Sequence, residues 1–343
     1  MKSSNKKIIF WLYSGCILVF AMVVIGGITR LTGSGLSITE WKVITGTLPP
    51  LNETDWQLEF AQYQLSPQFQ KINSDFNIED FKQIYFWEYF HRLIGRMIGI
   101  VFIIPFLYFY FKKQIDKKLL PKLIIIFLLG AWQGFLGWYM VKSGLQNNPF
   151  VSHYRLAIHL VNAFLTFGYI FWVVQDLNYP SVKNKTINKN VLLLSITAFV
   201  LLTIQITYGA FVAGLHAGHI FNSWPKMGDD WIASSVTSSF ESDGITSLFN
   251  SMATVQFIHR TLALIIFCLV FGIWLMRKKL SWKLNSEQIS SINMTMAIML
   301  IQVLLGIFTL LFNVPVWLGV LHQAGAFMIF AAMIFQIHRI AKS

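Results

Sequence analysis

The sequence predicts an all-α integral membrane protein, with eight transmembrane helices arranged as two tandem, pseudo-symmetric four-helix bundles. Three observations support this fold class. Hydrophobic residues make up 55% of the 343 residues, and the mean hydropathy of +0.57 is far above that of soluble domains. Eight apolar runs are long enough to cross a bilayer, which takes about 20 residues. The motifs of the first half of the chain recur in the second half.

The apolar runs are expected to be helices, because a helix satisfies all of its backbone hydrogen bonds internally. The first run follows Lys6 and Lys7, as in a signal peptide, but it is long and lacks a cleavage site. We therefore expect the chain to retain it as the first span. Two long segments, 29–84 and 213–251, are expected to cap the outer ends of the bundles. The expected spans are 8–28, 85–111, 121–141, 153–174, 191–212, 252–276, 291–311 and 317–338.

The net charge of +12 indicates membrane orientation rather than nucleic-acid binding. With a cytoplasmic N-terminus, 17 Lys and Arg residues fall on the cytoplasmic side and six on the outer side. Basic residues gather in the cytoplasmic loops of membrane proteins. We therefore predict that both termini are cytoplasmic. A bacterial inner membrane is the simplest location, because no transit segment precedes the first span.

The cysteine content excludes several kinds of metal site. Only Cys16 and Cys268 occur, both within expected spans. The absence of a Cys-x-x-Cys-His motif excludes covalent c-type haem attachment. Zinc or iron–sulfur sites built on thiolates would lack ligands, so both cysteines are interpreted as small apolar packing residues.

The motifs of the first half recur in order in the second half. Gly26 and Gly35, at the end of the first span, have the same spacing as Gly209 and Gly218, at the end of the fifth. A His-Arg pair recurs in the second and sixth spans, and Gln-x-x-Leu-Gly recurs in the third and seventh. Four spans per unit give both halves the same orientation. The predicted bundles are residues 1–177 and 191–343, joined near a Lys-rich loop at 178–190.

One histidine occupies a corresponding position on each of four spans, close to the outer side of the membrane. Each is followed four residues later by Gly or Ala, and positions i and i+4 share a helix face. A planar macrocycle ligated through iron needs such a flat, open patch, and two opposed imidazoles give a six-coordinate haem. A packing role is the alternative for any single histidine. The repeat favours metal ligation, with His91 paired to His159 and His259 to His322.

Neighbouring charged residues distinguish the two predicted haem sites. Glu88 stands three residues before His91, whereas the neutral Gln256 stands three before His259. Glu88 is a candidate proton relay, general acid or base, or stabiliser of a developing cation. The alternative is a structural ion pair with an arginine. The asymmetry favours chemistry in the first bundle and electron transfer in the second.

Several arginines near the same level are candidate partners for haem propionates, through bidentate pairing. The alternative for each of them is snorkelling to the membrane interface. His216 and His219, in an outer segment, have a spacing suited to a metal, but no counterpart exists in the first half. The candidate arginines are Arg92, Arg155 and Arg260, together with Arg96 and, more weakly, Arg30.

Taken together, five segments resemble the heme A synthase family, and the resemblance covers nearly the whole chain. None of the segments would be specific alone. The segments are Gly26-Gly27-x-Thr29-Arg30-Leu31-Thr32-x-Ser34-Gly35-Leu36-Ser37, Glu88-x-x-His91-Arg92, Tyr154-Arg155-Leu156-Ala157-x-His159-Leu160, Asn222-x-Trp224-Pro225-x-Met227 and Leu321-His322-Gln323.

The resemblance implies that haem O is the substrate, bound near His91 and His159, and that haem b is bound by His259 and His322. Glu88 matches a glutamate that is linked to catalysis in this family. The implied reaction oxidises a ring methyl group to a formyl, through successive hydroxylations and loss of water, and gives haem A for terminal oxidase assembly. The chain is similar to the cysteine-free class, because its outer segments lack a cysteine pair.

The implied partners are haem O itself, an external electron donor, haem O synthase and terminal oxidase assembly factors. No nicotinamide or flavin motif is present, so the electrons would come from another protein or from a quinol. The competing interpretations are a di-haem b-type electron carrier that oxidises quinol and, third, a haem transporter or chaperone. Small-residue helix faces also leave a homo-oligomer open.

Overall fold

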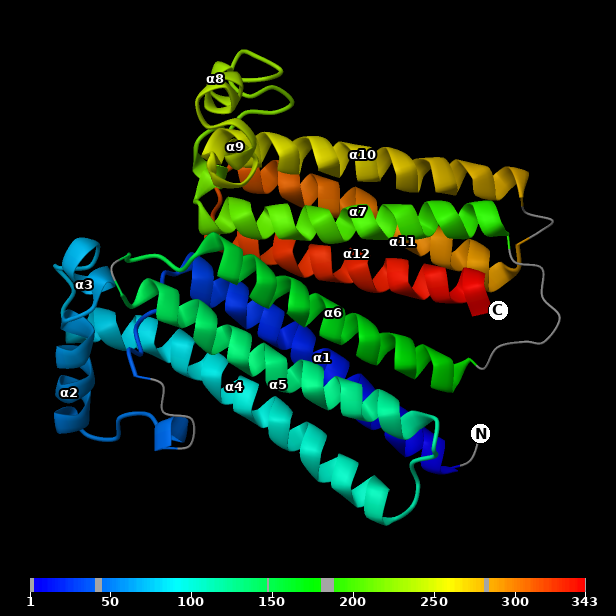
Figure 1. Cartoon of the computed structure of the whole chain (residues 1–343), viewed down its shortest axis with the longest axis horizontal. Coiled ribbons are helices and arrows are strands. Elements are labelled where there is room, and N and C mark those ends of the chain that lie inside the picture. Colours follow the sequence, from blue (N-terminus) through cyan, green and yellow to red (C-terminus); the bar gives the residue numbers. More distant parts are fainter. Residues whose placement is uncertain (1–2, 41–44, 147, 180–187, 281–283, 343) are drawn as a thin grey trace. The chain divides into compact units, whose positions relative to one another are not determined.

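The computed structural model describes residues 3–40, 45–146, 148–179, 188–280 and 284–342, and most of these residues are helical (Figure 1). Eight of the helices are long and apolar enough to cross a membrane, which confirms the predicted all-α class with eight spans. They are α1 (Ser3–Leu31), α4 (Ile78–Phe111), α5 (Leu119–Gly144), α6 (His153–Asn178), α7 (Lys189–Gly214), α10 (Met252–Lys279), α11 (Ser286–Leu311) and α12 (Val316–Lys342).

The chain divides into two compact units, one of residues 17–163 and one of residues 1–16 with 164–343. Both α1 and α6 contribute to each unit. The predicted bundle boundaries stay a prediction. Most of the Lys-rich joining loop, residues 180–187, lies outside the described residues, as do five of the lysines counted for orientation.

In the unit that contains the C-terminal half, four long helices form a closed ring. α7 packs against α10 and α12, and α11 packs against the same two helices (Figure 1). This is the neighbour order of a four-helix bundle. One end of the bundle is filled by a buried apolar cluster from all four helices and the loop before α11. The cluster consists of Val191, Ile273, Leu284, Ile292 and Ile340.

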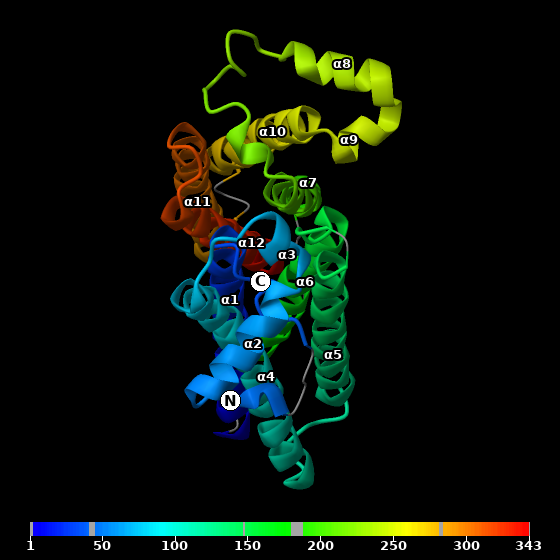
Figure 2. The ribbon, with the colours of Figure 1, turned by 90° about the vertical axis from the view of Figure 1, so that its left-hand side faces the viewer.

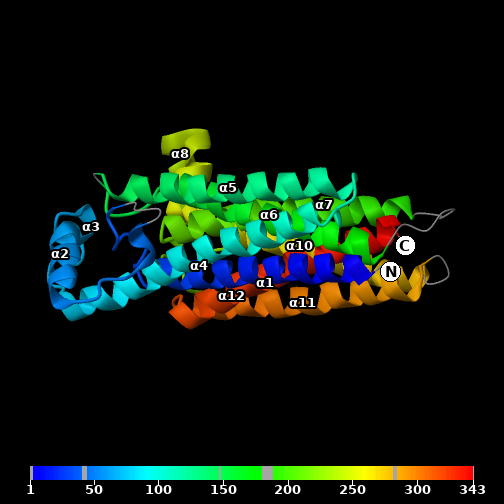
Figure 3. The same ribbon diagram turned by 90° about the horizontal axis from the view of Figure 1, so that it is seen from below.

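The other unit carries two short helices at the start of α4. They are α2 (Glu53–Gln64) and α3 (Pro67–Lys71), and Figure 3 shows α2 lying across that end of α4. An aromatic cluster joins them, with the rings of Tyr63 and Phe81 stacked at 5.1 Å between centroids. α4 begins earlier than expected because Asn77 and Asp80 form a capping box. The segment 29–84 therefore contains helices of its own.

The second long outer segment also folds into short helices. α8 (Ser234–Asp243) and α9 (Ser247–Asn250) precede α10 and pack against its first turns (Figure 2). Met227, Ala233 and Val236 bury their side chains against Ala253 of α10. This packing places the segment beside the end of α10 from which His259 projects.

Candidate functional site

In the unit of residues 17–163, each predicted ligand lies against a glycine of the neighbouring helix. A methyl group on Gly26 of α1 would lie 3.4 Å from Nε2 of His91 on α4. A methyl group on Gly137 of α5 would lie 3.2 Å from Cε1 of His159 on α6. The absence of a Cβ thus gives each imidazole ring room to approach the backbone of the neighbouring helix.

The unit of residues 1–16 and 164–343, called the C-terminal unit below, repeats this arrangement. His259 of α10 packs against Gly209 of α7, where a methyl group would lie 3.2 Å from Cε1 of the ring. His322 of α12 packs against Gly306 of α11, where the corresponding distance is 2.9 Å. All four histidines predicted from the sequence therefore share one local environment. That environment depends on a glycine at a fixed place on the partner helix.

The histidines of each unit lie near one another. The rings of His259 and His322 have centroids 6.4 Å apart and planes at 81°. Bonds from imidazole nitrogen to a first-row metal are about 2 Å long, so two imidazoles on opposite sides of one metal have centroids about 6 Å apart. In the other unit, His91 and His159 are likewise neighbours, on α4 and α6.

Two ring nitrogens of these histidines lack a hydrogen-bond partner among the described residues. Nδ1 of His159 and Nδ1 of His259 are buried, and neither has a hydrogen-bond partner within the described part of the chain. A buried polar atom without a partner is costly unless a bound group satisfies it. Haem iron is a group of that kind, so the residues present fit the ligand set expected for a haem.

Three glutamines hold the backbone of three of these histidines. Nε2 of Gln133, Gln205 and Gln302 donates to the carbonyl oxygen of His159, His259 and His322 at 3.1, 2.9 and 3.0 Å, respectively. The same nitrogen lies within 3.2–3.4 Å of a ring nitrogen of the same histidine. This role was not predicted from the sequence. The signal was present, because each glutamine stands four residues before the glycine that faces the ring.

Both carboxylate oxygens of Glu88, on α4, have polar partners. Its side chain is 3% exposed, and its Oε1 pairs with Arg92 Nη2 at 2.6 Å. Its Oε2 accepts from the Ser37 hydroxyl at 2.7 Å and from the Ile38 backbone N–H at 2.8 Å. Arg92 also donates to the backbone carbonyls of Ile38 and Glu40. The carboxylate thus fastens the segment after α1 to the helix that carries His91.

The C-terminal unit has the same network without the carboxylate. Gln256 donates to the carbonyl of Phe221 at 3.2 Å, and Arg260 donates to the carbonyls of Ser223, Pro225 and Lys226. Arg260 Nη1 is buried without a hydrogen-bond partner among the described residues. Because Gln256 is neutral, the charge of Arg260 has no carboxylate there that corresponds to Glu88.

Arg155 and His219 lie near the ends of their helices, whereas Arg96 lies near the middle of α4. Arg155 of α6 donates to the backbone carbonyl of Tyr139 at 2.9 Å, and its guanidinium lies 3.8 Å from the centroid of that ring. His219 contacts Asn313 at 3.1 Å between Nδ1 and Oδ1. The described residues contain no group of three or more His, Cys, Asp or Glu side chains placed to hold a metal ion.

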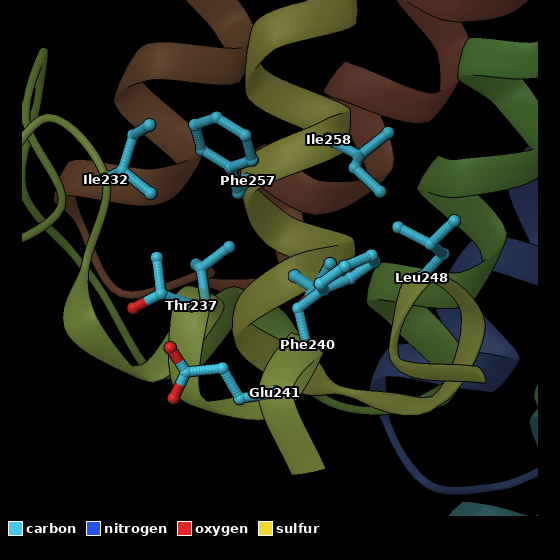
Figure 4. A pocket seen from close by; sticks show the side chains of 9 residues that line it. Ile232, Thr237, Phe240, Glu241, Leu248, Phe257 and Ile258 are labelled. Atoms are coloured by element: carbon cyan, nitrogen blue, oxygen red, sulfur yellow. The ribbon is translucent and has the colours of Figure 1, made fainter. Parts of the chain in front are cut away.

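An apolar cavity of ≈ 410 Å³ lies where α8 and α9 meet α10 (Figure 4). Its lining includes Ile258, the neighbour of His259 in the sequence, and the carboxylate of Glu241. None of the site residues predicted from the sequence lines it. The other lining residues are Ile232, Val236, Thr237, Phe240, Leu248, Thr254 and Phe257.

Comparison with known proteins identifies the family. Residues 9–334 match the COX15-CtaA family, described as a cytochrome oxidase assembly protein. The chain is 49% identical over 347 residues to the heme A synthase of Flavobacterium johnsoniae, with all of both chains covered. The chain belongs to the heme A synthase family. The heme A synthases of Flavobacterium psychrophilum (48% identity, 99% of each chain) and Nitrosospira multiformis (44%, 98% of this chain and 94% of the relative) also match.

The two cysteines of the chain both lie in long apolar helices. Cys16 is buried in α1, and Cys268 is exposed in α10. These are the only cysteines of the sequence, so neither outer segment contains one. This chain therefore has no cysteine pair in an outer segment that could carry electrons.

Proposed function

We propose that this protein is a heme A synthase, which oxidises a ring methyl group of haem O to a formyl and gives haem A for cytochrome oxidase. One observation supports this above all. The family's two pairs of histidines lie in two similar environments, and only one pair has a carboxylate beside it. Two successive hydroxylations of a methyl group followed by loss of water give a formyl, so one chemical site is sufficient.

The haem O site is assigned to His91 and His159, in the unit that contains Glu88. Support comes from the glycines that face the two rings and from the orphaned Nδ1 of His159. The carboxylate of Glu88 is held by Arg92 and by the segment after α1, so its side chain keeps one position on α4. We propose that this anchored carboxylate is the catalytic group of the site, acting on protons or on developing positive charge.

The haem b site is assigned to His259 and His322, whose ring separation suits bis-imidazole ligation of a resident haem. Haem b, when bound, supplies one-electron redox chemistry through its iron. Gln205 and Gln302 would keep the two imidazoles in place. Gln256 takes the position of Glu88 and offers no proton-transfer group, which suits a site that only passes electrons.

The arginines are proposed to meet haem propionates to different extents. Arg260 is the strongest candidate, because its Nη1 is buried without a partner among the described residues and no carboxylate corresponding to Glu88 accompanies it. Arg92 is already paired with Glu88, so a propionate there would share the guanidinium. Arg155 has one backbone carbonyl and one aromatic ring as neighbours, which leaves donors for an anion.

The protein spans the membrane with eight helices, and we propose that both termini are cytoplasmic and that the haem sites lie near the periplasmic side. A bacterial inner membrane is the proposed location. Electrons would come from an external donor, either another protein or a quinol. Haem O synthase and terminal oxidase assembly factors are the proposed partners for delivery and release, and a homo-oligomer stays open.

The experiment that tests this function supplies haem O, a reductant and oxygen to the purified protein in lipid. Pigments extracted over time are then separated by chromatography. We expect haem O to decline as a hydroxylated intermediate and then haem A appear. Haem O that stays unchanged, while haem b is reduced by quinol, would instead identify a di-haem electron carrier. Haem O that is bound and released unchanged would identify a haem transporter.

A further inference from the structure

The helices that face the four histidines differ at one position relative to the glycine under the ring. The helix that faces His159, His259 or His322 carries a glutamine four residues before the glycine under the ring. On α1, which faces His91, the residue four before Gly26 is Met22. α1 and α7 are equivalent helices of the repeat, so Met22 corresponds to Gln205. His91 is the one predicted ligand with methionine in the glutamine's place.

The exchange of glutamine for methionine changes how the histidine is held. A glutamine amide donates across the helix pair to the histidine carbonyl and lies beside the ring, so it fixes both backbone and imidazole. The thioether of methionine has no N–H to donate, and its side chain is flexible. Met22 instead packs toward Gly95, one turn after His91, where a methyl group would lie 3.7 Å from its Cε. This contact is apolar and supplies no N–H donor to the backbone carbonyl of His91.

We propose that Met22 makes His91 the releasable ligand of the haem substrate, whereas His159, held by Gln133, stays bound. This inference rests on the proposed function. A substrate haem must enter and a product haem must leave at each turnover, so at least one of its two histidine bonds has to break easily. The resident haem b has no such requirement, and both of its histidines are held by glutamines. Met22 is thus a positioning residue that acts through His91.

The test compares how fast each haem leaves the purified full-length protein. An excess of a haem-scavenging apo-globin is added, and the haems that remain bound are extracted and identified over time. The variants are Met22→Gln, Met22→Leu and Gln205→Met. Partners that orient a metal ligand typically change metal affinity 10- to 100-fold. We therefore expect Met22→Gln to slow the release of haem O and haem A about tenfold, with haem b unchanged and Met22→Leu like the wild type.

The reciprocal variant tests the same principle at the other site. Gln205→Met should speed the release of haem b roughly tenfold and raise its high-spin fraction in the absorption spectrum, because His259 is loosened. Equal release of haem O and haem A from Met22→Gln and Met22→Leu would overturn the proposal. An unchanged rate of haem b release in Gln205→Met would also overturn it. If Met22→Gln does not fold, the Gln205→Met measurement alone tests the proposal.

The outcome that contradicts the proposed function is different. A wild-type protein that binds haem b but neither haem O nor haem A would refute the substrate site itself. If only the Met22 proposal fails, the protein still binds both haems, but the substitutions at Met22 and Gln205 do not change the rates at which the haems are released.

Discussion

Glu88 and Arg92 lie one turn apart on α4 and form an ion pair of 2.6 Å, with side chains 3% and 10% exposed. Both are also bonded to the segment that follows α1. The structural ion pair that the sequence left open as an alternative to catalysis is therefore present. The two roles are compatible, because a carboxylate fixed by an arginine can still act on a bound substrate. Experiments must separate them.

The first prediction concerns Glu88→Gln, which gives this site the residue found at position 256. The amide keeps the size of the side chain but removes the charge, so a catalytic carboxylate would be lost. We expect haem A formation to fall roughly a hundredfold, the usual scale of general acid–base catalysis, with haem O accumulating and haem b retained. Haem extraction from membranes measures this.

The matched control for that variant is Glu79→Gln on the same helix, which changes an exposed carboxylate. It should leave the haem A yield unchanged. If Glu88→Gln produced normal haem A and only lowered thermal stability, Glu88 would be purely structural. Breaking a buried ion pair typically costs about 3–5 kcal/mol, so such a loss would be measurable.

The second prediction concerns the glycine beneath a histidine ring. Gly306→Ala places a methyl group 2.9 Å from Cε1 of His322, which the ring cannot accept without moving. We expect loss of haem b, or a shift of its spectrum away from six-coordinate, with a cost of about 1–3 kcal/mol for overpacking. Gly272→Ala on α10 is the control, because nothing lies within 4 Å of its added methyl group. Equal haem b content in the two variants would argue against the ring position described here.

The third prediction concerns the arginine that lacks a carboxylate partner. Arg260→Gln removes a positive charge next to His259, so the oxidised, more positive iron becomes relatively more stable. The midpoint potential of haem b should fall by tens of millivolts, which for one electron corresponds to about 1 kcal/mol. A redox titration followed by absorption measures it. Arg277→Gln, at the other end of α10, should leave the potential unchanged, and a similar shift in both variants would contradict a local effect of Arg260.

The fourth prediction concerns orientation. The excess of basic residues on one side predicts that short tags at the N-terminus and at the C-terminus are both cytoplasmic. In intact cells with a permeable outer membrane, added protease should leave both tags uncut. A tag in the segment 213–251 serves as the control and should be cleaved. Cleavage of both terminal tags would reverse the topology.

Much of the fold could be predicted from the sequence, because bilayer burial leaves a signal in hydropathy alone. The eight spans and the repeated histidines both follow from residue type and position along the chain. The helices within 29–84 and 213–251 could not be predicted in this way, since those segments mix polar and apolar residues. Those in 29–84 form because caps such as Asn52 and Asn77 and the aromatic cluster around Phe81 stabilise them together. In 213–251, Val236 of α8 is buried in a cluster with Ala253 of α10.

Contacts across helices were the harder part of the site to predict. Gln133 and Gln302 were recognised as repeated, yet nothing in the sequence states which way a helix is rotated or what an amide meets on its neighbour. Gln205 was missed because its counterpart in the first half is Met22. The interruption of the repeat concealed the pattern and at the same time marks the place where the two sites differ.

The central claim is that two histidine pairs hold two different haems. The most direct test extracts and identifies the haems of His91→Ala and His322→Ala, purified from cells that make haem O. We expect His322→Ala to lose haem b while keeping haem O or haem A. His91→Ala should show the converse, with haem b retained and haem O and haem A lost or reduced. Loss of the same haem from both variants would contradict the two-site account.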